Sequence, residues 1–173
     1  SRYSDSSYSK TYNIYLTVTP MDSFSTDSTQ LKWITNDNLA KGYRDIKLTK
    51  INDNRFLLMW ERNVNEEASI AGDDDVDSMS QHILHYMYLD GNGNVIGSEK
   101  TAPAAISDCE PVLKDGKVVF YASDGASIAF YSIDATTGQF DKTCMYAAGK
   151  AAVWNYADVV LTITGKGDLF IYI

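Results

Sequence analysis

The chain has 173 residues and a net charge of −8, with 15 Lys and Arg against 23 Asp and Glu. This length allows one domain with a sizeable core. An acidic chain is repelled by phosphate backbones and anionic lipids, and no run approaches the ~18 apolar residues of a membrane span, so we expect no nucleic-acid partner and no membrane insertion.

The first part of the chain is predicted to be a flexible tail followed by a hairpin. Residues 1–10 are Ser-rich and polar, and we expect them to be a flexible N-terminal segment, with the folded domain at residues 11–173. Tyr12–Thr19 alternates apolar and polar residues, which is typical of a strand with one buried face. A second strand is expected at Gln30–Thr35, after a polar loop.

The middle of the chain contains four further predicted strands, Asp45–Ile51, Arg55–Trp60, Ile83–Leu89 and Val95–Thr101. Tight turns at residues 52–54 and 90–94 join them in pairs. In the second turn Asp90, Asn92 and Asn94 offer spaced oxygens, but the Asn-Gly-Asn sequence is a sufficient hairpin signal. Residues 61–80 are polar and rich in Asp and Glu, so we expect an acidic insertion there.

Residues 108–140 predict more strands joined by turns. Val118–Tyr121 and Ser127–Ile133 are rich in β-branched and aromatic residues, and Asp-Gly and Thr-Gly pairs supply the turns. Their apolar runs are continuous, which favours strands covered on both faces. No apolar period of 3.6 residues persists anywhere, so we expect almost no helix. The expected core residues of the repeats are Phe56, Leu58, Val119, Phe120, Leu161 and Phe170.

Units of strand and turn recur along the chain. Asp45, Asp108 and Asp158 each begin a unit, and without the insertion their period is about 45 residues. An antiparallel four-stranded unit of about 40–50 residues is the size of a propeller blade, so from Tyr12 to Ile173 the chain resembles β-propeller repeat proteins. This all-β, propeller-type fold is our first expectation, and a β-sandwich is the alternative.

The count of predicted strands is informative. It gives the last two strands of one unit, two full units, and the first two strands of a fourth, which is less than the ~4–8 blades of ordinary propellers. Either the chain is a piece of a longer protein, which we prefer, or a second chain completes the array. Cys109 and Cys144 fall on the first and fourth strands of one predicted sheet, too far apart for a disulfide, so we expect two free thiols.

The repeated positions give the candidate ligand-binding residues. In a propeller Asp45, Asp108 and Asp158 would stand on the innermost strands, around one channel mouth, although each Asp could instead accept hydrogen bonds within its own turn. Tyr43 and Tyr156 lie two residues before a repeat Asp, where a ring could stack on a sugar or a peptide, although repeated aromatics more often pack between sheets.

The remaining candidates for chemistry are weak. Asp73, Asp75 and Asp77 follow the opening pattern of a calcium loop, but Gly at position six and Glu at position twelve are missing, so any Ca²⁺ site there is weak and no other cofactor is expected. His82 and His85 are three apart on a strand and therefore point to opposite faces. Gly125–Ala129 resembles a nucleophile elbow but lies between strands.

These features predict a non-catalytic binding or scaffolding module that presents loops to a protein or carbohydrate ligand, outside the cell or at its surface. No catalytic residue is assigned. The alternative is part of a propeller-fold enzyme, similar to a glycoside hydrolase, in which repeat carboxylates act as acid and base. Such an enzyme needs two carboxylates about 5–9.5 Å apart.

Overall fold

A computed structural model describes most of the chain, and its residues cluster into two compact units, 1–43 and 44–173, which are considered separately. The residues described are 13–23, 25–36, 44–63, 82–123, 127–147, 160–163 and 169–172.

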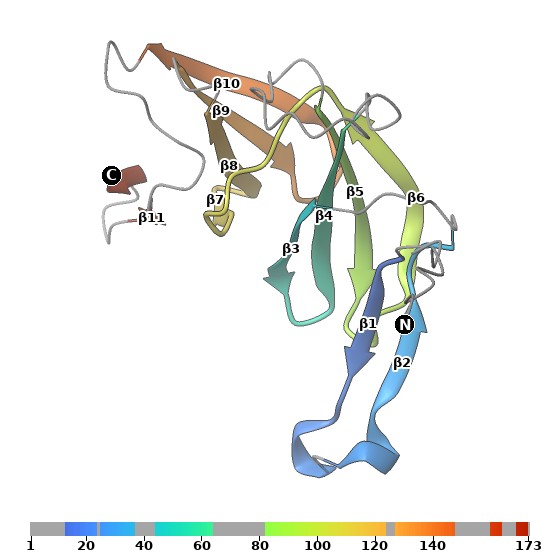
Figure 1. The fold of residues 1–173 in the computed structure, drawn as a ribbon. Coiled ribbons are helices and arrows are strands. Elements are labelled where there is room, and N and C mark those ends of the chain that lie inside the picture. Colours follow the sequence, from blue (N-terminus) through green and yellow to red (C-terminus); the bar gives the residue numbers. More distant parts are fainter. Residues whose placement is uncertain are drawn as a thin grey trace, which may run out of the picture. The chain divides into compact units, whose positions relative to one another are not determined.

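The N-terminal unit contains one antiparallel hairpin of β1 (Tyr15–Val18) and β2 (Gln30–Trp33), as predicted (Figure 1). Two short 3-10 turns, Met21–Ser23 and Thr26–Ser28, join the strands. The Ile14 amide donates to Thr35 Oγ1 at 2.8 Å and the Ile14 carbonyl accepts from Ile34 at 2.8 Å, which fastens the open end of the hairpin.

The second unit begins with a four-stranded antiparallel sheet in the order β3-β4-β5-β6 (Figure 1). Each strand pairs with the next in the sequence because short turns join β3 to β4 and β5 to β6. The strands are β3 (Arg44–Asn52), β4 (Arg55–Asn63), β5 (His82–Asp90) and β6 (Val95–Ala102). β4 continues to Asn63, so the strand extends three residues into the stretch that the sequence assigned to the acidic insertion.

A second four-stranded sheet follows with the same consecutive pairing, β7-β8-β9-β10. Its strands are β7 (Val112–Lys114), β8 (Lys117–Ser123), β9 (Ser127–Asp134) and β10 (Phe140–Ala147). β7 begins at Val112 rather than at Asp108, and Pro111, which has no N–H to give to a strand ladder, directly precedes it. Cys109 therefore lies before the strand, and its sulfur is not part of a disulfide bond.

A last pair of antiparallel strands, β11 (Val160–Ile163) and β12 (Leu169–Tyr172), forms a two-stranded sheet. β7 lies beside both β3 and β11. β3, β7 and β11, the first strands of three successive repeats, therefore lie side by side in that order. The all-β, antiparallel architecture predicted from the sequence is confirmed, and the only helical elements in the described residues are the two 3-10 turns.

The two four-stranded sheets share one apolar core. Its side chains alternate along the inner strands and include Leu57, Met59, Leu84, Tyr86, Val118, Phe120, Tyr131 and Ile133. The opposite faces of these strands are buried too, as Trp60, Leu89 and Tyr121 show. Strands covered on both faces were predicted from the continuous apolar runs, and this is confirmed. Of the expected core residues, Leu58 and Phe120 are buried, Phe56 and Val119 are half-buried, and the side chains of Leu161 and Phe170 lie outside the description.

Side chains from the first sheet hold the turn between β9 and β10. Tyr86 and Tyr88 donate their hydroxyls to the carbonyls of Gly138 and Asp134, at 3.0 and 2.5 Å. Lys100 Nζ donates to the Thr137 carbonyl at 2.6 Å. Because this turn belongs to the second sheet, the contacts fix the two repeats to each other.

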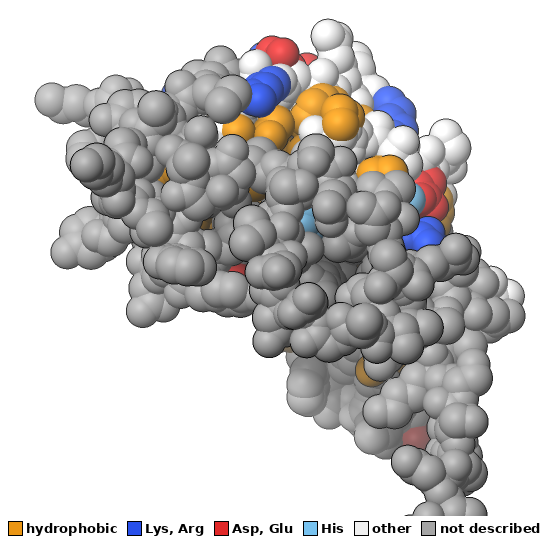
Figure 2. Space-filling model, turned by 45° about the horizontal axis from the view of Figure 1, so that its top comes forward, with side chains coloured by type: hydrophobic (Ala, Val, Ile, Leu, Met, Phe, Trp, Pro, Cys, Tyr) orange, Lys and Arg blue, Asp and Glu red, His pale blue; other side chains and the backbone are white. Residues whose placement is uncertain are grey.

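The described surface carries both signs of charge. On the face drawn in Figure 2, apolar side chains of the described residues lie next to basic and acidic ones. No helix in the described ranges has the length and apolar character needed to span a membrane.

Candidate functional site

The candidate site lies where the first sheet meets the segment that leads into the second. Asp45 stands at the start of β3, at a β-bulge: Arg44 pairs with Glu61 and Lys47 with Met59, so two residues of β3 oppose one residue of β4. The backbone of Asp45 has a φ of 49°, in the left-handed region that Asp tolerates better than most residues. A bulge changes the direction of the side chains next to it, so the Asp45 carboxyl does not follow the regular alternation of β3.

The opposite wall of the site is the connection between β6 and β7, residues 103–111. Its middle is buried, and two hydrogen bonds fix it. The Ile106 amide donates to Glu61 Oε2 at 2.9 Å, and the Ser107 amide donates to the Tyr121 carbonyl at 3.2 Å. The following residues, Asp108 and Glu110, are exposed. A rigid connection therefore presents two carboxylates next to β3.

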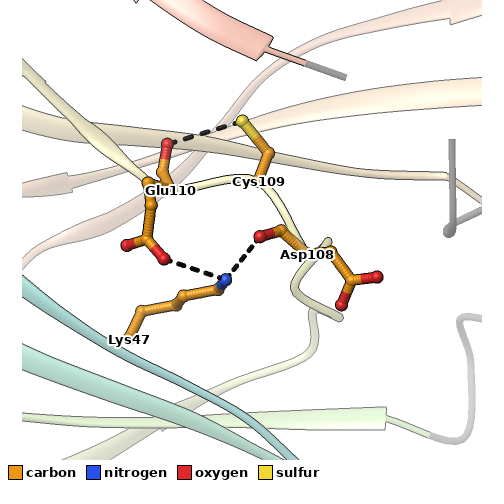
Figure 3. Close-up of polar contacts among 4 residues, drawn as sticks. All are labelled: Lys47, Asp108, Cys109 and Glu110. Carbon is orange, nitrogen blue, oxygen red and sulfur yellow. Dashed lines mark hydrogen bonds and ion pairs between the residues drawn. The ribbon is translucent and has the colours of Figure 1, made fainter. Parts of the chain in front are cut away.

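Lys47 joins the two walls, as Figure 3 shows. Its side chain is 10% exposed, and its Nζ donates to the Asp108 carbonyl at 2.5 Å and to Glu110 Oε1 at 3.2 Å. The Cys109 thiol between them donates to the Glu110 carbonyl at 3.6 Å. We call Asp45, Lys47, Asp108 and Glu110 the junction cluster.

Two of the predicted carboxyls, Asp45 and Asp108, lie near enough to interact electrostatically. The pKa of Asp45 is raised from 3.8 to about 6, mainly because the carboxyl is partly buried. The charges of Glu61 and Asp108 and the hydrogen bond to Asp108 raise it further, while Lys47 lowers it. Near pH 6 the Asp45 carboxyl therefore holds a proton that it can donate, which most aspartates do not.

Glu61 is a buried residue of β4 whose charge raises the pKa of Asp45 in the junction cluster. It is only 3% exposed, with Oε1 bonded to His82 Nδ1 and Oε2 accepting from Ile106. The predicted acidic insertion begins at Glu61, but in the structure Glu61 continues β4, and its side chain accepts a hydrogen bond from the connection before β7. His82 and His85 have separate partners, as expected, because His85 Nδ1 contacts Glu99 at 2.5 Å.

Several candidate residues lie outside the described part of the chain. Tyr43, Tyr156 and Asp158 are among them, and so are the calcium-loop candidates Asp73, Asp75 and Asp77. Within the described ranges, no three His, Cys, Asp or Glu side chains are grouped so as to hold a metal ion. The binding roles predicted for these six residues stay predictions.

Other turn aspartates act in the ordinary way. Asp90 Oδ1 accepts from the amides of Asn92 and Asn94, both at 2.8 Å, which confirms the hairpin interpretation of that stretch. Asp134 Oδ1 similarly accepts from the amides of Thr136 and Thr137. Asp45 differs from both, because its interactions are with Asp108, Glu61 and Lys47.

Sequence reasoning missed Lys47, Glu61 and Glu110. The bulge between Arg44 and Lys47 breaks the regular alternation of the strand, so the two-residue spacing from Asp45 did not indicate Lys47. Glu61 directly follows a strong apolar run, which allows the strand to continue. The position of Glu110 depends on the fold of the connection before β7, and no local pattern indicates it.

Comparisons with known proteins give the fold context. No protein-family model matches the chain, and no curated protein matches it in sequence. A similar solved structure is the crystal structure of polysaccharide lyase Uly1, with a TM-score of 0.50 and 12% sequence identity. The similarity covers 90% of this chain, and the chain spans 30% of that protein's length. At this identity the likeness concerns the fold alone, and it agrees with the β architecture.

Proposed function

We propose that this chain is a non-catalytic binding module that uses the junction cluster to bind a carbohydrate. The observation that carries the proposal is the contact between Asp45 and Asp108, one from each of two successive repeats, at the rim formed by exposed Asp108 and Glu110. A protonated carboxyl next to carboxylates offers both a donor and acceptors, which a sugar hydroxyl needs. The polysaccharide lyase with a similar fold supports carbohydrate as the first ligand class to test.

The charges at the site favour a neutral glycan. The cluster and its neighbour Glu61 contribute four carboxyl groups, and Lys47 Nζ already donates to the Asp108 carbonyl and to Glu110. An anionic polysaccharide would meet this acidic surface and a net charge of −8. Neutral sugars avoid that repulsion and still provide hydroxyls.

Binding is tested by titration calorimetry with neutral and with uronate-containing oligosaccharides. Asp108→Asn should weaken binding of the neutral ligand about tenfold, equivalent to about 1.4 kcal/mol, because it replaces a charged acceptor. Asp141→Asn, an exposed carboxylate on β10, is the matched control and should leave affinity unchanged. Stronger binding of the uronate-containing ligand, or equal affinity of wild type and Asp108→Asn, would contradict the proposal.

A second candidate is an enzyme that uses Asp45 as a general acid, and its pKa of about 6 favours it. Such an enzyme would need a second carboxyl ~5–5.5 Å away for a retaining or ~6.5–9.5 Å away for an inverting glycosidase mechanism. Release of reducing ends from a neutral polysaccharide, abolished in Asp45→Asn, would support the enzyme over the binding module.

A further inference from the structure

The N-terminal hairpin presents two aromatic rings on one face. Tyr15 on β1 and Trp33 on β2 are paired directly across the strands, with their ring centroids 5.6 Å apart, and they are 57% and 63% exposed. Thr17 and Leu31 form the pair two residues along the strands, so they lie on the same face, and Leu31 is 54% exposed. We call these four residues, all of the N-terminal unit, the hairpin face.

In the two full repeats, aromatic side chains on the strands are buried. Tyr86 on β5 and Tyr131 on β9 are each 3% exposed, and each one bonds to or stacks on a neighbour. A single exposed apolar residue is ordinary on a protein surface, whereas a cluster that includes two aromatic rings is typical of a surface that binds a ligand. The cross-strand pair of Tyr15 and Trp33 also stabilises the hairpin, but this role leaves most of both residues in water.

The polar atoms of the hairpin face indicate which kind of ligand fits it. Tyr15 carries a hydroxyl and Trp33 an indole N–H, and no residue in the described part of the chain bonds to either group. Thr17 adds a second hydroxyl, and none of the four side chains is charged. A suitable ligand therefore has a flat apolar side for the rings, hydrogen-bonding groups at its edge and no charge. A sugar ring combines C–H groups on its faces with hydroxyls around it.

Size and charge argue against a macromolecular partner other than a glycan. A stable protein–protein interface needs ~20–30 residues on each side, and the hairpin face has only four. Nucleic-acid bases also stack on aromatic rings, but a net charge of −8 repels their phosphate backbone. A neutral glycan meets neither difficulty.

We propose that the hairpin face is a second carbohydrate-binding site, on which a neutral, linear glycan stacks against Trp33 and Tyr15. The proposal takes its ligand class from the proposed function, but it shares no residue with the junction cluster. The two ring planes are inclined at 63°, so one flat sugar ring cannot lie parallel to both. Consecutive sugars of one chain therefore contact the two rings, and a single sugar binds more weakly than an oligosaccharide.

Acrylamide quenching of tryptophan fluorescence in the intact chain tests the site directly. The chain has three tryptophans, and in Trp154→Phe only exposed Trp33 and buried Trp60 remain. Cellohexaose or maltohexaose, which are neutral and linear, should lower the quenching of Trp33 by about half, because a stacked sugar covers one face of the ring. Glucose at the same concentration should have a smaller effect.

Substitutions on the hairpin face separate ring stacking from general apolar contact. In titration calorimetry Trp33→Leu, which keeps an apolar side chain without a ring, should weaken hexasaccharide binding about tenfold, and Trp33→Phe should weaken it less. Leu31→Ala, on the same face, is the matched control and should leave the affinity unchanged. Slow exchange of the Ile34 amide, which bonds to the Ile14 carbonyl at 2.8 Å, checks that the hairpin of each variant is folded. If Trp33→Leu loses this protection, the quenching experiment decides.

The outcomes distinguish this proposal from the proposed function. Quenching of Trp33 that neither hexasaccharide changes overturns the proposal, and so does binding that folded Trp33→Leu leaves intact. If that binding is lost in Asp108→Asn, the junction cluster alone binds the glycan and the proposed function stands. Binding that is lost in Trp33→Leu and unchanged in Asp108→Asn supports the hairpin face and contradicts the proposed function. An equal loss in Leu31→Ala and Trp33→Leu would exclude stacking.

Discussion

Replacing Asp45 by Asn gives the sharpest test of the junction cluster. The folded-state pKa of about 6 lies above the ordinary value of 3.8, so the folded protein binds this proton more tightly than the unfolded chain does. The stability from the proton is therefore complete below pH 3.8 and is lost as the pH rises through about 6. Asn keeps the shape of the protonated side chain and carries no charge at any pH.

The size of the effect follows from the pKa. A rise from 3.8 to about 6 corresponds to about 3 kcal/mol, and solvent screening of this half-exposed carboxyl reduces it to about 1–2 kcal/mol. Relative to wild type, the free energy of unfolding of Asp45→Asn should therefore increase by about 1–2 kcal/mol between about pH 4 and pH 7.5. Urea unfolding followed by tryptophan fluorescence measures it, with buried Trp60 as a reporter.

Asp53→Asn is the control for this measurement. Lys50 lowers the pKa of Asp53 through a hydrogen bond and its charge, so both the folded and the unfolded value lie below about pH 5. Its stability relative to wild type should stay constant from about pH 5 to 8. A constant difference for Asp45→Asn over the same range would refute the raised pKa of Asp45 and the burial that causes it.

Three further changes test the packing of the repeats. Phe120→Ala removes a fully buried ring that stacks on Tyr131 and should cost about 3–5 kcal/mol in urea unfolding, and a near-neutral result would mean that β8 is not central to the core. Gly97→Ala should cost about 1 kcal/mol because of its positive φ. Gly138→Ala should destabilise more, because a Cβ there would also press on the Tyr88 ring at 3.2 Å and on Lys100 Nζ at 2.7 Å; equal thermal shifts would contradict the packing of these side chains on the turn. Asp134→Ala should destabilise the protein at neutral pH, because hydrogen bonds from Thr137 and Thr136 lower the pKa of Asp134. The loss of stability relative to wild type should shrink as the pH falls below about 4, and a loss that does not change with pH would exclude a stabilising role of these hydrogen bonds.

Much of the fold was predictable because strands and turns are encoded locally. Continuous β-branched and aromatic runs such as Val118–Tyr121 indicated strands buried on both faces, and Asp-Gly or Asn-Gly pairs marked the turns between them. The approach of Asp45 and Asp108 was expected only through their repeated position at the start of each unit. The bulge at Asp45 was not predictable, because no residue pattern around Asp45 indicates it and Asp is common in ordinary turns as well.

The position of Glu61 could not be predicted from the sequence, for a physical reason. Glu61 was assigned to the acidic insertion because it begins a polar, acidic stretch, yet charge composition describes a segment on average and not a single side chain. A buried carboxyl group is stable where polar partners bind both of its oxygens. For Glu61 these partners are the His82 ring and the Ile106 amide, 21 and 45 residues away in the sequence. Such partners come from tertiary structure, so local sequence cannot reveal them.

Aspartate therefore has two different roles in the repeats, one in the turns after the third strands and one at the start of β3. At Asp90 and Asp134 the carboxylate satisfies amides of its own turn, and its charge stays exposed to water. At Asp45 the bulge turns the carboxyl toward the next repeat, where burial and Asp108 favour the protonated form. A turn cap therefore stabilises the fold at neutral pH, whereas the raised pKa of Asp45 makes its ionised form cost stability there, which is why Asp45 is the first residue to test in the proposed binding site.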